Sequence, residues 1–240
     1  MIEFLTVNCW TLIMVIAVLE IIFVGLFAVD YKKTKRPMAL CAAILTFGLF
    51  YDAFMIDMGN VLGAGGLLET LSQFRFVSHG MLIPLLFPIC AYALKAKEKT
   101  VKIVWGITAV LMVAGLAEAL ATDLEIISLS EAFANKGLSV NVGGDLIRYQ
   151  SSELTPGWAE GISMALSFGT VIPLIICGVA VWVKQKNPCI FLSGLLMFAF
   201  AGAGPSMAGG VLTFFITMFG ELFMVGFIYA YLKTDKKELI

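Results

Sequence analysis

Residues 70–95 read TLSQFRFVSHGMLIPLLFPICAYALK, and this stretch decides the class of fold. The segment is apolar and longer than the roughly 20 residues that an α-helix needs to cross a bilayer. It nevertheless carries Arg75 and, four residues later, His79, the only histidine in the chain. Because an ionisable group inside hydrocarbon is costly, these two side chains are expected to face a protein interior or a wet cavity.

The composition of the whole chain agrees with a membrane protein. Hydrophobic residues make up 60% of the 240 residues and charged residues 14%, whereas soluble domains hold about 45–50% and about 25%. We therefore expect a single membrane domain over residues 1–240, with the lipid bilayer as its main partner. The net charge of −1 and the lack of a basic tract with interleaved aromatics argue against a nucleic-acid partner. A homo-oligomer is compatible with this composition.

Seven apolar segments indicate an all-α, seven-transmembrane-helix bundle. The expected spans are approximately residues 5–29, 38–59, 70–94, 101–122, 157–183, 188–207 and 209–232. The N-terminus lacks the basic region of a secretory signal, and the first apolar run is too long for a cleaved one, so we interpret it as a retained span.

The positions of the basic residues predict the orientation. Thirteen of the sixteen lysines and arginines fall in the linkers 31–36, 95–102 and 184–186 and in the tail 233–237. Loops rich in lysine and arginine stay in the cytoplasm. The N-terminus is therefore expected outside and the C-terminus in the cytoplasm, most simply in a plasma (cell inner) membrane.

The longest connection, residues 123–156, is expected outside the cell and folded. Ser128 and Glu131 form the S-x-x-E pattern of a capping box, which predicts a short helix that runs through Asn135. Alternating runs around Gly143 and Gly144 indicate a β-hairpin. Such a loop could act as a lid over an outer mouth or simply cap the surface.

Ionisable and polar residues are expected to cluster in the outer half of the bundle. The third span places Arg75 and His79 on one helical face, since residues four apart share a face. Asp52 and Tyr51 lie at similar depth on the second span, and Asp52 is the preferred partner of Arg75. Glu118 lies near the outer end of the fourth span. The pair of Asp52 and Arg75 could bind ligand, or it could simply hold two helices together.

Two glutamates are expected deeper in the membrane. Glu20 in the first span and Glu221 in the seventh are each flanked by apolar residues, and nothing basic lies at their depth. We expect them to be protonated, to bond to each other or to Ser and Thr, or to face water. Pro84, Pro88 and Pro173 mark positions where the third and fifth spans can bend.

No cofactor is expected. His79 could be a neutral core residue, a proton relay or a ligand contact, and a metal ligand is the least favoured of its roles. A single histidine argues against a zinc hydrolase, which normally uses two or three histidines or cysteines. No lysine lies inside the seventh span, so a retinal Schiff base has no attachment point.

Three classes of function remain open from the sequence. The leading hypothesis is a transporter or small-ligand-binding protein with an outward-facing polar pocket, in which Arg75 holds a polar or anionic ligand and His79 and Asp52 exchange protons. The second is an intramembrane enzyme acting on a lipid or isoprenoid, with Asp52 and Glu118 as acid and base. The third is a non-catalytic sensor or assembly subunit, so whether the chain is an enzyme stays open.

Overall fold

The computed structural model describes residues 2–139 and 145–235, and it contains seven helices long and apolar enough to cross a membrane. They are α2 (Cys9–Thr34), α3 (Pro37–Asp57), a third span made of α5 (Gly66–Leu82), η1 (Ile83–Leu85) and α6 (Leu86–Ala93), α7 (Glu98–Ala121), α9 (Gly157–Gln185), α10 (Cys189–Ala203) with η2 (Gly204–Ser206), and α11 (Thr213–Thr234). The chain is therefore an all-α, polytopic membrane protein, and the spans lie within a few residues of those expected from the sequence.

Local sequence explains where these helices begin and end. Asn8 bonds through its side chain to the Phe4 carbonyl oxygen at 2.8 Å and separates the short α1 (Ile2–Val7) from α2. The first span therefore begins later than the expected residue 5. Lys35 and Lys186 end α2 and α9 in the left-handed conformation, with φ of 56° and 58°, and their N–H groups close the last helical turn.

Proline breaks one of the two spans where a bend was expected. The third span changes from α-helix to a 3₁₀ turn at Ile83–Leu85, because Pro84 has no N–H to donate to the preceding turn. This break lies one turn beyond His79. In contrast, α9 continues as a single helix through Pro173.

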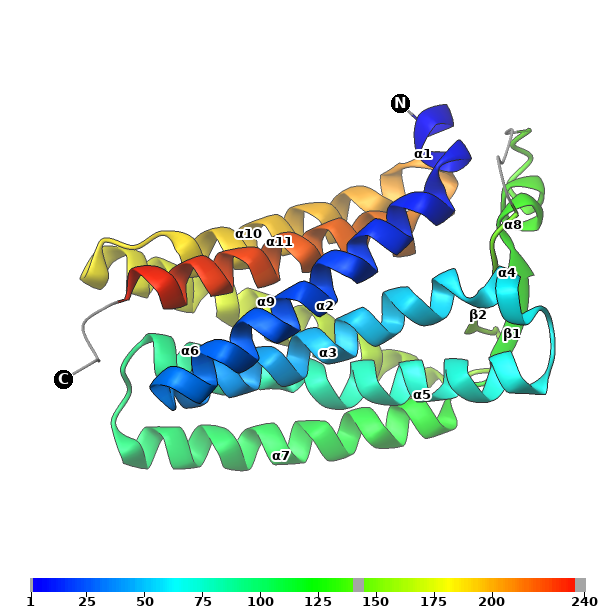
Figure 1. Ribbon diagram of the computed structural model, residues 1–240. Helices are drawn as coiled ribbons and strands as arrows, with labels where there is room; N and C mark the ends of the chain where they lie inside the picture. Colours follow the sequence, from blue (N-terminus) through cyan, green and yellow to red (C-terminus); the bar gives the residue numbers. More distant parts are fainter. Residues whose placement is uncertain (1, 140–144, 236–240) are drawn as a thin grey trace.

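The spans close into a ring in the order of the chain (Figure 1). Each span packs against the next, and α11 returns to pack against α2. The third span also contacts α9 through its α6 part, so it touches the second, fourth and fifth spans. The third span is therefore in contact with three other spans of the bundle.

The connection between α7 and α9 is folded, but not wholly as expected. Ser128 caps α8 (Leu129–Asn135) by accepting a hydrogen bond from the Glu131 N–H, as the capping box predicted. The strand β2 (Ile147–Ser151) pairs antiparallel with β1 (Leu124–Ser128), which precedes the helix. The expected hairpin turn at Gly143 and Gly144 lies outside the described residues.

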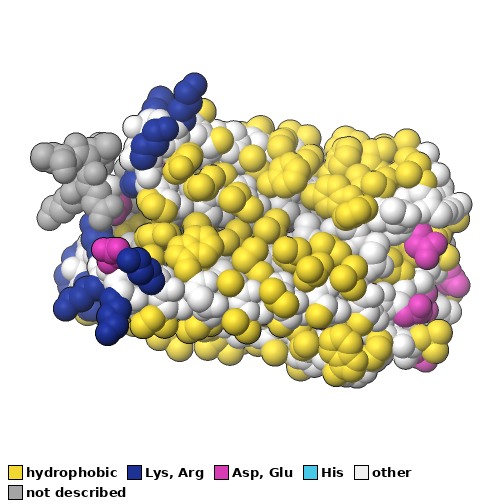
Figure 2. All heavy atoms as spheres, turned by 90° about the horizontal axis from the view of Figure 1, so that it is seen from below, with side chains coloured by type: hydrophobic (Ala, Val, Ile, Leu, Met, Phe, Trp, Pro, Cys, Tyr) yellow, Lys and Arg dark blue, Asp and Glu magenta, His cyan; other side chains and the backbone are white. Residues whose placement is uncertain are grey.

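The two ends of the bundle differ in charge. One end carries the chain's lysine-rich linkers and the C-terminal end of α11, and we call it the basic end; Figure 2 shows lysine and arginine side chains gathered there. The opposite end carries β1, α8, β2 and the short α4 (Gly59–Leu62), and we call it the loop end (Figure 1). Between them the surface is mostly apolar, as a bilayer requires (Figure 2).

Two hydrophobic clusters fill the interior. One lies toward the basic end and includes Phe27, Leu86 and Tyr231. The other joins the loop to the bundle, with Phe133 of α8 packed among residues such as Ile13 and Phe215. The polar faces of the third span and α7 lie outside both clusters. The candidate site lies at these polar faces.

Candidate functional site

Two adjoining cavities lie beside the third span. The polar cavity, of about 230 Å³, is lined by Asp52, Arg75, Phe76, His79, Gly80, Ile83, Glu118, Ser163, Leu166 and Ser167. The apolar cavity, of about 220 Å³, extends from His79 and Ser167 to Glu221 and Met224 on α11. His79, Ile83 and Ser167 line both cavities, so the two spaces meet at these residues.

A groove connects this pair of cavities to the loop end. The loop-side groove, of about 420 Å³, shares Glu118, Ser163 and Ser167 with the cavities and reaches Ser151 and Thr155 beside the strand β2. The lining residues therefore form a continuous series from the loop to Glu221. The shared residues place the three spaces side by side between the loop end and the middle of the bundle.

Arg75 is buried and held by three groups. Its Nε lies 3.2 Å from Asp52 Oδ1, and its Nη2 donates to the Tyr149 carbonyl oxygen at 2.8 Å. The guanidinium also lies 4.8 Å from the centre of the Phe76 ring. The pairing with Asp52 expected from the sequence is therefore present, and it is accompanied by a bond to the loop. Because the Nε–H is not aimed at the carboxylate, the pair is held by charge more than by a hydrogen bond.

A second arginine, absent from the residues singled out in the sequence, reaches the same region. Arg148 on β2 lies with its guanidinium 4.1 Å from the centre of the Phe214 ring and donates to Gln150 Oε1 at 2.9 Å. Burial, together with the positive charge of Arg75, lowers the pKa of Arg148 to about 10. It therefore remains charged at neutral pH. Arg148 belongs to the extramembrane loop, and only the pairing of β1 with β2 brings it here.

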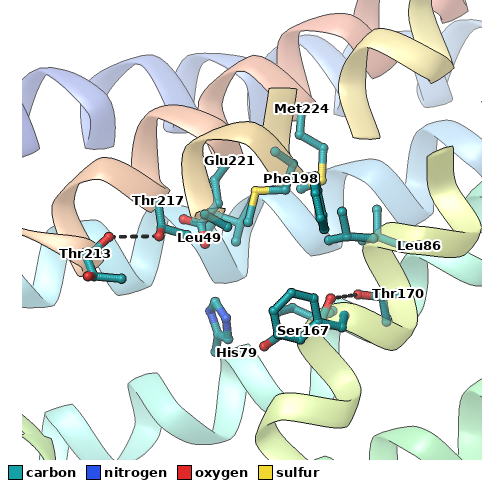
Figure 3. Close-up of a pocket in the computed structure, with 15 residues that line it drawn as sticks. Leu49, His79, Leu86, Ser167, Thr170, Phe198, Thr213, Thr217, Glu221 and Met224 are labelled. Atoms are coloured by element: carbon teal, nitrogen blue, oxygen red, sulfur yellow. Dashed lines mark hydrogen bonds between the residues drawn. The ribbon is translucent and has the colours of Figure 1, made fainter. Parts of the chain in front are cut away.

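His79 lies where the two cavities meet. Its ring points from α5 toward Thr217 and Glu221 of α11, with Ser167 of α9 nearby (Figure 3). The ring Nδ1 is buried and has no hydrogen-bond partner in the described part of the chain. The His79 side chain lines both cavities, but the Nδ1 atom itself is sealed from them.

Glu118 reaches the polar cavity because two glycines let α5 and α7 cross closely. A Cβ built at Gly115 would lie 2.1 Å from the Gly80 carbonyl oxygen, so only glycine fits at that position. At this crossing, the Glu118 carboxyl lies beside Gly80, Ser163 and the Thr122 hydroxyl, whose oxygen is 3.5 Å away. No basic side chain pairs with it among residues 2–139 and 145–235.

The two deep glutamates differ in access. Glu221 lines the apolar cavity, whereas Glu20 is fully buried and both of its carboxylate oxygens lack a hydrogen-bond partner among the described residues. The two carboxyls are near enough to interact electrostatically, but within the described chain no hydrogen bond joins them. Of the alternatives expected for these two residues, a direct hydrogen bond between Glu20 and Glu221 is not formed in this structure.

Tyr51 lies outside the walls of both cavities. Its hydroxyl donates to the Leu71 carbonyl oxygen at 3.1 Å and so joins α3 to α5 near the buried Arg75. This contact positions helices. Of the residues predicted for the site, the structure thus brings Asp52, Arg75, His79, Glu118 and Glu221 to the cavities and leaves Tyr51 and Glu20 behind them.

Several neutral polar residues that complete the walls were not predicted. On α9 they are Ser163, Ser167 and Thr170, and on α11 they are Thr213 and Thr217. Each set follows helical spacing, and the α11 set continues to Glu221. A stripe of hydroxyls three or four residues apart in an apolar helix was the available signal. In the described residues, no group of three or more His, Cys, Asp and Glu side chains could hold a metal ion.

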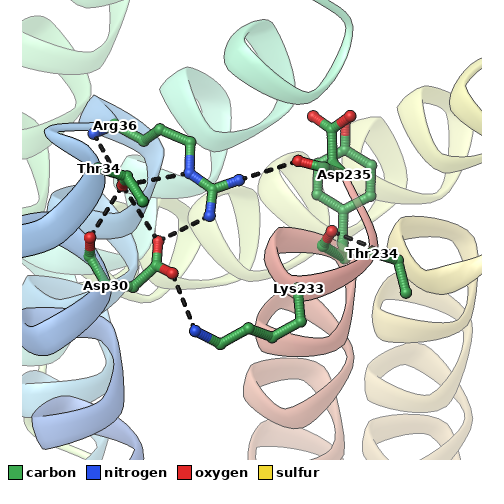
Figure 4. A network of polar contacts seen from close by, with 7 residues as sticks. Asp30, Thr34, Arg36, Lys233, Thr234 and Asp235 are labelled. Carbon is green, nitrogen blue, oxygen red and sulfur yellow. Dashed lines mark hydrogen bonds and ion pairs between the residues drawn. The ribbon is translucent and has the colours of Figure 1, made fainter. Parts of the chain in front are cut away.

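The basic end carries a polar network beside a hollow of about 470 Å³, which Arg36, Lys95 and Asp235 help to line. Asp30 on α2 pairs with Arg36 at 2.9 Å and with Lys233 of α11 at 3.0 Å. Arg36 also donates to the Asp235 carbonyl oxygen (Figure 4). The Asp235 side chain pairs with Lys95 at 3.1 Å. The network ties together the ends of the first, second, third and seventh spans.

No protein-family model matches the chain, and no curated protein shows significant sequence similarity to it.

Proposed function

We propose that this protein is a transporter, or a binding protein of related design, that takes up a small ligand with a polar group from outside the plasma membrane. In this proposal the loop end faces outward and the basic end lies in the cytoplasm, because lysine-rich loops remain on the cytoplasmic side. The observation that carries the proposal is the continuous series of lining residues from the loop to Glu221, combined with ion pairs that join the ends of the spans at the basic end.

The ligand site of the proposal is the polar cavity. Arg75 already interacts with Asp52 and the Tyr149 carbonyl, so we assign ligand contact to Glu118, His79 and Ser163, which are free of such strong pairing. Arg75 and Asp52 then position the wall. The sequence analysis expected Arg75 to hold a polar or anionic ligand, and this proposal assigns ligand contact to other residues instead.

The proposed site also exchanges protons. Glu221 lies deep between apolar neighbours with no basic partner in the described chain, and a carboxyl in such surroundings is favoured in its neutral form. His79 lies between Glu221 and the groove, and an imidazole can pass a proton near neutral pH. Coupling of ligand uptake to protons is the expected consequence.

Cysteine labelling tests the outward-facing cavity. Ser163→Cys and Ser167→Cys should react with a membrane-impermeant methanethiosulfonate (MTSET) added outside right-side-out vesicles, because both positions are exposed along the groove. Four of the five native cysteines are buried, which keeps the background low. Ser193→Cys on α10 is the matched control, since Ser193 is fully buried and should not react.

The orientation needs its own control. Lys99→Cys, at an exposed position of the basic end, should react only in inside-out vesicles. If Ser163→Cys and Ser167→Cys react only in inside-out vesicles, or not at all, the proposed outward-facing site is wrong.

A further inference from the structure

The apolar cavity approaches the lipid-facing surface between α9 and α10. Phe168 of α9 and Phe198 of α10 both line this cavity, yet they are 51% and 42% exposed. Their rings meet edge to face with centres 6.5 Å apart. A single pair of aromatic side chains therefore forms the wall between this cavity and the outside of the bundle.

The outer side of this wall borders hydrocarbon and also the loop-side groove, because Phe168 and Met164 line that groove. Phe168 lies ~16 Å along α9 from its start at the loop end, which is about half of the ~30 Å apolar core of a bilayer. The neighbouring surface residues Met164, Ile172 and Leu195 are also exposed and apolar. A molecule that passes between the two phenylalanines from the side of Ile172 and Leu195 would come from the lipid.

Polarity changes along the joined cavities. Glu118, His79 and Ser163 line the part nearer the loop end, whereas Leu86, Val171 and Met197 line the deeper part beside the two phenylalanines. The joined volume falls in the lower part of the range of about 300–1,000 Å³ that is typical of ligand sites. A polar head followed by an apolar chain matches this order.

The charges indicate the sign of the head group. Glu118 lacks a basic partner in the described chain, while Arg75 is paired with Asp52. A cation placed beside Glu118 gains a charge-assisted hydrogen bond. An anionic head would instead meet an unpaired carboxyl group.

On this basis, and resting on the proposed function, we propose that the ligand is a single-chain amphiphile with a protonated amine head, which reaches the cavities from the outer leaflet between α9 and α10. The head lies at Glu118 and His79, and the chain fills the apolar cavity and passes between Phe168 and Phe198. The amphiphile thus enters sideways from the bilayer.

Protection from labelling tests this proposal with defined probes. Dodecylammonium, below lytic concentration, should slow the reaction of Ser167→Cys with MTSET at least tenfold in right-side-out vesicles, because the chain covers that position. Butylammonium should give little protection, since it lacks the chain, and dodecanoate should give little because its head has the wrong charge. Adding Glu118→Gln should raise the half-protecting concentration of dodecylammonium about tenfold, as expected for the loss of one charge-assisted contact.

Ser206→Cys is the control that distinguishes protection by binding at the site from a general effect of the amphiphile on the membrane. Ser206 is exposed at the loop end and lines neither cavity, so its labelling should not change. Equal protection by butylammonium, equal protection of Ser206→Cys, or no protection of a reactive Ser167→Cys would each overturn the amphiphile proposal. If Ser163→Cys and Ser167→Cys do not react even without amphiphile, the failure belongs to the outward-facing site itself.

Discussion

At the scale of single residues, Asp145 holds the start of α8 against the strand that follows. Its Oδ1 accepts from the Ser130 N–H at 2.9 Å and its Oδ2 from the Ser130 hydroxyl at 2.6 Å. Partial burial opposes ionisation, but these hydrogen bonds outweigh it and hold the pKa of Asp145 below its usual value. The ionised carboxylate therefore stabilises the folded loop.

The stability of the loop should consequently depend on pH. Because the folded pKa is lowered, the stabilisation is complete above the unfolded value of about 3.9 and is lost as the pH falls through the folded pKa. Asp145→Asn should lower the free energy of unfolding by on the order of 1 kcal/mol at pH 7, since the side chain is exposed and screened. Thermal denaturation of both proteins from pH 7 to pH 3 should show this difference shrink as the pH falls below about 3.9.

Ser130→Ala provides the control for this pair. If the Ser130 hydroxyl is the partner that matters, the double variant should lose less stability than the two single variants together. Strict additivity would contradict the role given to this contact.

At the scale of elements, the crossing of α5 and α7 depends on Gly80 and Gly115. Gly115→Ala would place a Cβ 2.1 Å from the Gly80 carbonyl oxygen, so the two helices must separate. We expect a loss of about 1–3 kcal/mol, as for other overpacked interiors. The loss is measured as a fall in the thermal midpoint of the detergent-solubilised protein, with size-exclusion chromatography as the readout of the folded fraction.

Gly106→Ala is the matched control on the same helix. A Cβ at Gly106 meets nothing within 4 Å, and alanine is the better helix former. Its midpoint should be unchanged or slightly higher. Equal destabilisation by the two substitutions would show that α7 is sensitive to any change and not to this crossing.

At the scale of the whole molecule, the network at the basic end opposes access from that side. Asp30 is buried and makes two ion pairs, so Asp30→Asn removes charge-assisted bonds to Arg36 and Lys233. If the protein is a transporter, the ends of the first, second and seventh spans should then separate more readily. We expect Asp30→Asn to raise the labelling rate of Ser167→Cys by MTSET in inside-out vesicles severalfold.

Glu98→Gln is the matched control for this variant. Glu98 pairs with Lys102 at 2.7 Å, but both side chains are exposed, and such pairs contribute only about 0–1 kcal/mol. Its labelling rate should equal that of the parent protein. An unchanged rate in Asp30→Asn as well would favour a static binding protein over a transporter.

The sequence alone was sufficient for the class of fold and for several local features. Apolar segments long enough to cross a bilayer can satisfy their backbone only as helices, so the seven spans follow from composition and length. The cap at Ser128 follows from a four-residue pattern, and the 3₁₀ turn at Pro84 from a missing N–H. Helical spacing and depth also gave the pairing of Arg75 with Asp52.

Other features depend on how the helices rotate and cross, which the sequence of any one span does not contain. Glu118 faces Gly80 only because α7 crosses α5 at Gly115, and Arg148 lies close enough to Arg75 to interact electrostatically because β2 packs against β1, α3 and α5. For the same reason the sequence could not separate Glu221, which lines a cavity, from Glu20, which is sealed behind it.

The stretch from residue 70 to 95 shows the division most clearly. Its sequence determined that a buried arginine and a buried histidine need polar or charged groups beside them, because hydrocarbon does not solvate them. The tertiary structure decided which groups these are. Arg75 interacts with Asp52 and a loop carbonyl, and His79 lines an open cavity. The cost of burying a charge is a property of the residue, whereas the groups that offset it come from other helices.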